Sequence, residues 1–174
     1  ELIDEGLEVN DLECVKRPWG IMKRSVGRIS NIIEDMLAYS KEHKPFLESC
    51  SLAEIIEDTF SSLEALMSQR SITIERDVRL EGECMVDARS IHRCLLNLLL
   101  NAVDAVELTG DGWIGFKAWS GSDGVIHITV EDNGSGIDEA VLKTIFDPFF
   151  STKGSRGTGL GLAVTRKIIE EHGG

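Results

Sequence analysis

The hydrophobic pattern near the start of the chain predicts one long helix. Apolar residues recur at alternating spacings of four and three, a heptad stripe made of Met22, Val26, Ile29, Ile33 and Met36. Pro18 suits the first helical position, so we expect the helix to run from Trp19 to about Glu42. The stripe could pack on its own domain. Two helices joined by a turn are too thin to bury it, however, which favours pairing with another chain.

The next segment alternates between helical and strand periods. Lys44-Pro45-Phe46 is expected to be a linker, because a residue before proline avoids the helical region. Ser51 and Glu54 form a capping box for a helix with the apolar residues Leu52, Ile55, Ile56, Phe60, Leu63 and Leu66. Strands are expected at 72–74, 84–86, 113–120 and 125–131. Asp138 is a candidate cap for a short helix with Val141, Leu142 and Ile145 facing inward.

A helix with three polar residues on one face is predicted between residues 92 and 106. Its apolar stripe is formed by Leu95, Leu98, Leu99, Ala102, Val103 and Val106. Asn97, Asn101 and Asp104 follow one another at spacings of four and three and share a face. The carbonyl oxygen of Asn101 suits a hard cation such as Mg²⁺, which also relies on phosphates. The alternative is an ordinary helix with a solvent-facing side.

Two glycine-containing loops complete the candidate chemistry. After the strand at 125–131, Asp132 is an acceptor for an exocyclic amine, and Gly134 and Gly136 allow a flat ligand to approach the backbone. A plain Asp-Asn-Gly turn is the alternative. The loop 157–161 precedes a helical segment, and freed N–H groups at a helix N-terminus can bind phosphate. The loop matches neither a Walker A motif nor a Rossmann fingerprint.

Composition excludes several classes of protein. A formal net charge of −12 over 174 residues argues against a nucleic-acid phosphate binder. The four cysteines have no CxxC pairing, which indicates reduced thiols and a cytoplasmic setting: Cys14, Cys50, Cys84 and Cys94. The apolar runs are far shorter than the roughly 20 residues that a membrane helix needs, although the parent protein could be membrane-anchored.

Four motifs in a fixed order resemble the ATP-binding domain of sensor histidine kinases, within the superfamily of gyrase, mismatch-repair ATPases and the large heat-shock chaperone. Asn97 and Asn101 match the N box, 132–136 the G1 box, 146–150 the F box and 157–161 the G2 box. The F box followed by Ser-Thr-Lys, and the closing Glu-His-Gly-Gly, resemble the nitrogen-regulation type most. The resemblance covers roughly residues 50 to 174.

The resemblance implies ATP and Mg²⁺ as cofactors and gives roles to matched positions. Asp132 would hold the adenine amine, Asn101 would ligate Mg²⁺, and residues 146–157 would form a mobile lid in which Lys153 contacts phosphate. Nucleotide contacts are expected at Asn101, Asp104, Ala105, Asp132, Gly134, Gly136, Ile137, Phe149, Lys153, Gly157, Thr158, Gly159, Leu160 and Gly161. Asn97 stands where hydrolysing relatives carry a glutamate base, which favours transfer to another acceptor over hydrolysis.

The resemblance also implies a fold and partners. We expect an α+β fold, a two-layer sandwich of mixed β-sheet and helices of the Bergerat type at residues 46–174, shortened at its C-terminus. Residues 1–45 would form part of a helical dimerisation hairpin. The partners would be a second copy of the chain and a response-regulator receiver domain, with no nucleic acid.

The expected phosphoacceptor histidine is absent from the family's position. We interpret all four histidines (His43, His92, His127 and His172) as non-acceptors and expect the acceptor about ten residues before Glu1, in a chain trimmed at its start. This excerpt would then bind ATP without phosphorylating itself. The alternatives are a non-catalytic, ATP-dependent interaction module and an anti-sigma-type serine kinase of the same superfamily.

Overall fold

The computed structural model describes residues 12–40, 44–107, 109–154 and 157–174. The chain divides into two compact units, residues 1–41 and residues 42–174. No helix within these described ranges is long and apolar enough to cross a membrane.

The first unit contains α2 (Leu12–Ser40), a helix with Pro18 inside it. The prediction that Pro18 opens the helix is therefore wrong. A proline ring removes one backbone N–H donor, at about 3 kcal/mol in a helix interior, but its fixed φ is helical, so the helix can continue through it. The heptad stripe is present on α2, and all five of its apolar side chains are exposed: Met22, Val26, Ile29, Ile33 and Met36.

The second unit is built on a mixed three-stranded sheet. In it β2 (Thr73–Arg79) pairs parallel with β4 (Trp113–Ser120), and β4 pairs antiparallel with β5 (Ile126–Asp132). A second, two-stranded antiparallel pair joins β1 (Glu48–Cys50) to β3 (Cys84–Val86). The parallel pairing of β2 with β4 requires a crossover, and the intervening helix α4 provides it.

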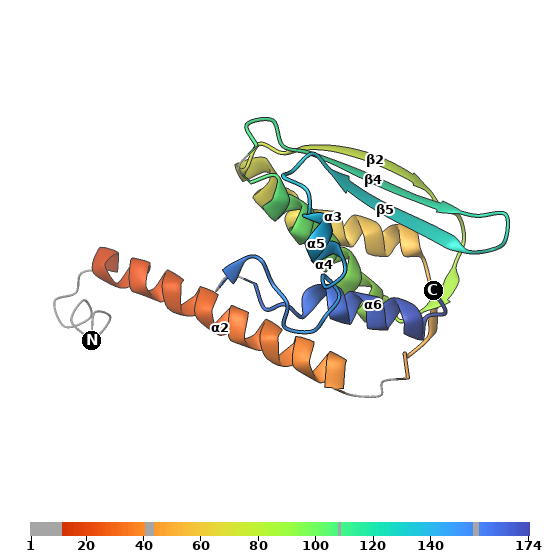
Figure 1. Cartoon of the computed structure of the whole chain (residues 1–174), viewed down its shortest axis with the longest axis horizontal. Helices are drawn as coiled ribbons and strands as arrows, with labels where there is room; N and C mark the ends of the chain where they lie inside the picture. The colour runs from red at the N-terminus through yellow and green to blue at the C-terminus, as the bar shows by residue number, and fades with distance from the viewer. Residues whose placement is uncertain (1–11, 41–43, 108, 155–156) are drawn as a thin grey trace. The chain divides into compact units, whose positions relative to one another are not determined.

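The helices α3 (Leu52–Gln69), α4 (Ala88–Ala105) and α6 (Gly161–Glu171) form the layer beneath this sheet (Figure 1). The strand β4 supplies the sheet's side of the core through Ile114, Phe116 and Ala118, each at most 1% exposed. The ring of Phe60 from α3 meets Phe116 edge to face, with centroids 5.1 Å apart. The expected α+β fold, a mixed sheet layered on helices, is confirmed.

Local sequence signals explain where these helices begin. The hydroxyl of Ser51 accepts a hydrogen bond from Glu54 N at the start of α3, as the capping box predicts. The carboxylate of Asp138 accepts one from Ala140 N and opens α5 (Glu139–Leu142). One expectation for α5 is wrong, because Leu142 is 48% exposed. A four-residue helix presents little more than one turn, so it cannot turn every apolar residue inward.

Candidate nucleotide-binding site

The polar face of α4 is set by the burial of its opposite side. Asp87 caps the helix by accepting a hydrogen bond from Ser90 N at 3.1 Å. The apolar stripe of α4 is buried against the core through Ile91, Cys94, Leu95, Leu99, Ala102 and Val103. Because that side is buried, the helical period places Asn97, Asn101 and Asp104 on the side of α4 that faces the loops following β5 and preceding α6.

The loop after β5 lies against the C-terminal end of α4. A Cβ atom on Gly134 would come within 2.6 Å of the Ala105 carbonyl oxygen, so only glycine fits there. Gly134 N donates to Asp132 Oδ1 at 3.0 Å, which leaves Asp132 Oδ2 to accept from a ligand. Gly134 and Ala105, which the sequence places far apart, are thereby brought together.

Beyond Gly134 the loop opens outward. Gly136 has a φ of +70°, a Cβ atom there would have no neighbouring atom within 4 Å, and the Ile137 side chain is 54% exposed. The left-handed backbone at Gly136 explains the glycine there. Both of these predicted contacts are thus accessible to a ligand.

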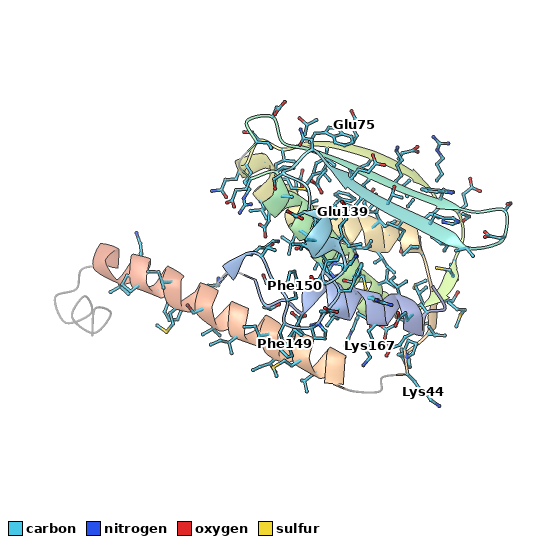
Figure 2. The ribbon with its side chains drawn as sticks, in the orientation of Figure 1. Lys44, Glu75, Glu139, Phe149, Phe150 and Lys167 are labelled. Carbon is cyan, nitrogen blue, oxygen red and sulfur yellow. The ribbon has the colours of Figure 1, made fainter. Side chains whose placement is uncertain are left out.

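The segment between α5 and α6, from which Phe149 and Phe150 extend (Figure 2), is held to the start of α6 by a close backbone contact. Phe149 N donates to Gly159 O at 2.9 Å, and both residues have positive φ, +66° in each case. For an aromatic residue this conformation is strained, by about 1–3 kcal/mol. The Phe149 side chain is nevertheless 66% exposed, so packing of the ring does not account for the strain.

The N-terminus of α6 points into the same region. Leu160 precedes it with no side-chain cap, and its own N–H donates to Thr158 Oγ1 at 3.2 Å. The first N–H groups of a helix have no intrahelical acceptor, and the helix dipole favours an anion beside them. Gly157 leads into this turn, where its N–H donates to Gly154 O at 3.3 Å. Helix α6 therefore offers a phosphate-sized anion site.

Asn97 fastens α4 to α6. Its Nδ2 donates to Gly161 O at 3.3 Å and lies 3.5 Å from Thr165 Oγ1. The amide is therefore engaged with the first turn of the helix whose N-terminus faces the site, and a carboxylate in its place would have no donor for Gly161 O.

Lys153, in the segment 146–157 that the resemblance predicts to be a lid, connects this segment to α4. Its Nζ donates to Asn101 Oδ1 and to Asp104 Oδ2, each at 2.8 Å. The Asn101 oxygen that the sequence assigns to a metal thus already faces a cation, which shows that its position and orientation suit a positive charge. Residues 155 and 156 of the predicted lid lie outside the described residues.

Several residues that support the site were missed by the sequence reasoning. Asn133 accepts from Trp113 N at 2.7 Å and donates to Asp111 O at 2.8 Å, so it ties the loop after β5 to the start of β4. The Asp-Asn-Gly sequence could have indicated this role, since Asn side chains often bond to backbone in turns. Arg70, at the end of α3, faces Asp104 at 3.5 Å. No local pattern indicates that contact.

A second missed cluster joins the N-terminal end of α4 to the C-terminal end of α6. Asp87 N donates to His172 Nε2 at 3.0 Å, while His172 Nδ1 lies 2.7 Å from Ile168 O and donates to it. Phe46 N donates to Asp87 Oδ2 at 3.2 Å. Burial disfavours the charged form of Asp87, but the Ser90 and Phe46 N–H groups outweigh it and hold the pKa of this carboxyl below its usual range.

A polar helix face, a glycine loop and a helix N-terminus converge on this two-layer α+β domain, an arrangement that suits a nucleotide. Residues 86–174 match the family described as histidine kinase-, DNA gyrase B- and HSP90-like ATPase. The chain belongs to this family and contains the ATP-binding domain of the histidine kinase type. Membership in an ATPase family implies ATP as the ligand.

Curated relatives agree with this membership. The signal transduction histidine-protein kinase AtoS of Escherichia coli K12 is 34% identical over 155 residues, which cover 88% of this chain and 25% of AtoS. The sensor histidine kinase ZraS of Salmonella typhi is 36% identical over 159 residues, which cover 88% of this chain and 33% of ZraS. The nitrogen regulation protein NtrY of Azorhizobium caulinodans is 32% identical over 157 residues, which cover 87% of this chain and 20% of NtrY. The chain thus spans a third or less of the length of these relatives.

Solved structures show the same fold. The catalytic domain of histidine kinase ThkA in a nucleotide-free form is 29% identical, with a TM-score of 0.62 over 72% of this chain and 80% of that one. ThkA in complex with the response regulator protein TrrA is 28% identical, with a TM-score of 0.70 over 92% of this chain and 45% of the ThkA chain.

Proposed function

We propose that this chain is the catalytic part of a protein histidine kinase that binds Mg-ATP and transfers the γ-phosphoryl group to a histidine outside these 174 residues. The observation that carries the proposal is the convergence of Asn101, Lys153 and the N-terminus of α6 beside the loop of Asp132. This set supplies an amine acceptor at one end and anion-binding groups at the other, as a nucleotide requires.

The reaction would depend on positioning and charge stabilisation. The histidine nitrogen attacks the γ-phosphorus, the bond to the β-phosphate oxygen breaks, and ADP leaves with that electron pair. Asn101 Oδ1 would hold Mg²⁺, which supplies positive charge to the phosphates. Lys153 and the first N–H groups of α6 would balance the charge that develops on them. Asn97 has no basic atom to activate water, which favours transfer over hydrolysis.

Two partners follow from the same proposal. The exposed stripe on α2 would pair with the stripe of a second copy, because burying apolar side chains at heptad spacing is the usual basis of helix pairing. The phosphoryl group would then pass to an aspartate of a response-regulator receiver domain. The ThkA relative was solved in complex with such a regulator, which supports this expectation.

Titration of the chain with ATP, with and without Mg²⁺, tests the proposal. We expect binding that strengthens with Mg²⁺ and falls at least tenfold in Asp132→Ala. Asp123→Ala is the matched control, because Asp123 Oδ1 also accepts an N–H from two residues ahead, Val125 N at 3.1 Å, in the hairpin between β4 and β5. Absence of ATP binding by a folded wild-type chain would refute the proposal.

A further inference from the structure

The lid lysine lies between an uncharged oxygen and a carboxylate of α4. Its ammonium donates to Asn101 Oδ1 and Asp104 Oδ2 with equal 2.8 Å distances. Asn101 contributes no charge, so the ion pair with Asp104 is what draws the ammonium to this place. The position of Lys153 therefore depends on where the Asp104 carboxylate is held.

Arg70 holds that carboxylate from the other side. Its Nη1 lies 3.5 Å from Asp104 Oδ1, and its Nη2 lies 3.4 Å from Glu107 Oε1. Arg70 Nη1 is buried, and among the described residues it makes no hydrogen bond. A buried guanidinium nitrogen without a hydrogen bond is unfavourable unless a nearby charge compensates it. The compensating charge is Asp104, which thus lies between two cations on its two oxygens.

We propose that Arg70 is a positioning residue of the nucleotide site, which acts through Asp104 to control the release of Lys153 from Asn101. In this structure the ammonium donates to the oxygen that would hold Mg²⁺. Mg²⁺ and the ammonium would repel each other at that oxygen, so Lys153 leaves Asn101 when Mg-ATP binds and moves toward the phosphates. Arg70 competes with Lys153 for the charge of Asp104 and so weakens its hold on the ammonium. This inference rests on the proposed function.

The arrangement predicts opposite effects for the two charged supports. Without the Arg70 charge, the Asp104 carboxylate attracts Lys153 more strongly. Its negative charge is also less compensated near the phosphates, so ATP binds more weakly. Removing the Asp104 charge frees Lys153 to pair with a phosphate, so metal-free ATP binds more tightly and depends less on Mg²⁺. The effect of Arg70 requires the Asp104 carboxylate, so the two substitutions are not additive.

A double-mutant cycle measured by ATP titration tests this inference. We expect Arg70→Gln to weaken metal-free ATP binding about fivefold and Asp104→Asn to strengthen it severalfold. In the Asp104→Asn background, Arg70→Gln should change the affinity less than twofold. Arg70→Lys keeps the charge and should restore most of the wild-type affinity. The cap of α3 is made by the Arg70 backbone N–H, so these side-chain changes leave it in place.

Arg79→Gln is the matched control. It also removes one arginine from an ion pair with an aspartate, Asp77 at 2.7 Å on β2, but away from α4. We expect no change in ATP affinity for this variant. Equal weakening by Arg70→Gln with and without Asp104, or no weakening at all, would overturn the inference while leaving ATP binding intact. A wild-type chain that does not bind ATP would instead overturn the proposed function itself.

Discussion

Gly159, which lies between the predicted lid and α6, permits the sharpest test of the site. Its φ is +66°, and a Cβ atom there would lie 2.7 Å from both Phe149 O and Phe150 N. Both neighbours are backbone atoms that cannot rotate away. In Gly159→Ala the left-handed conformation costs about 1–2 kcal/mol.

This cost of about 1–2 kcal/mol should appear in ligand binding. In the free chain, the segment around Phe149 can move away from α6 and relieve the overlap, whereas a closed nucleotide site requires the original contact. At 1.4 kcal/mol for each factor of ten, ATP affinity should fall by about 5-fold to 30-fold. Isothermal titration of Mg-ATP measures this directly, and circular dichroism confirms that the variant is folded.

Gly82→Ala provides the control. Gly82 also has a positive φ, +77°, but no atom lies within 4 Å of an added Cβ. It follows β2 and lies away from the lid, so we expect a stability loss of about 1–2 kcal/mol and unchanged ATP affinity. If Gly159→Ala binds ATP as tightly as wild type, the contact between lid and α6 is not part of the closed site. Equal losses in both variants would point to general destabilisation.

Three further predictions concern packing and titration. Gly134→Ala should weaken ATP binding at least tenfold in the same titration, because its Cβ would overlap the Ala105 carbonyl and displace the loop of Asp132. Asp87→Ala should lower the free energy of unfolding by about 0.5–2 kcal/mol at pH 7. The folded-state pKa of Asp87 is depressed, so this contribution is present above its unfolded pKa and is lost as pH falls through the folded value. Urea titrations should therefore show a smaller difference in the free energy of unfolding between wild type and Asp87→Ala at pH 3 than at pH 7. Burial raises the pKa of Cys94 to about 12, so at pH 8 its thiol should react with a disulfide reagent only after unfolding, and Cys94→Ala should remove that slow phase.

The elements that the sequence predicted well are those whose signals are local. The stripe of α4 and the Ser51 cap depend on residues three or four apart, and both are present as expected. The strand β1 was not predicted, because Glu48–Cys50 contains no β-branched or aromatic residue and becomes a strand only through pairing with β3. Such long-range pairing is the part of a fold that a local pattern does not contain.

The candidate site shows the same division. Asn101, Asp132 and the glycines could be selected from motif and spacing, since their chemistry and conformational freedom are properties of the residue type. The positive φ of Phe149 could not, because an aromatic residue adopts it only when the surrounding structure requires it. Arg70 could not either, since its partner Asp104 comes from a different helix and no spacing rule relates them.

Asn97 shows that one residue can serve both chemistry and architecture. As an amide it cannot take a proton from water, which is the property the sequence emphasised. In the structure the same amide donates to Gly161 O and so joins α4 to the first turn of α6. A glutamate at position 97 would place an acceptor against that carbonyl, and the two oxygens would repel. Gaining a base for hydrolysis would therefore disturb the start of α6, where the phosphates are proposed to bind, so hydrolysis would require a change at α6 as well.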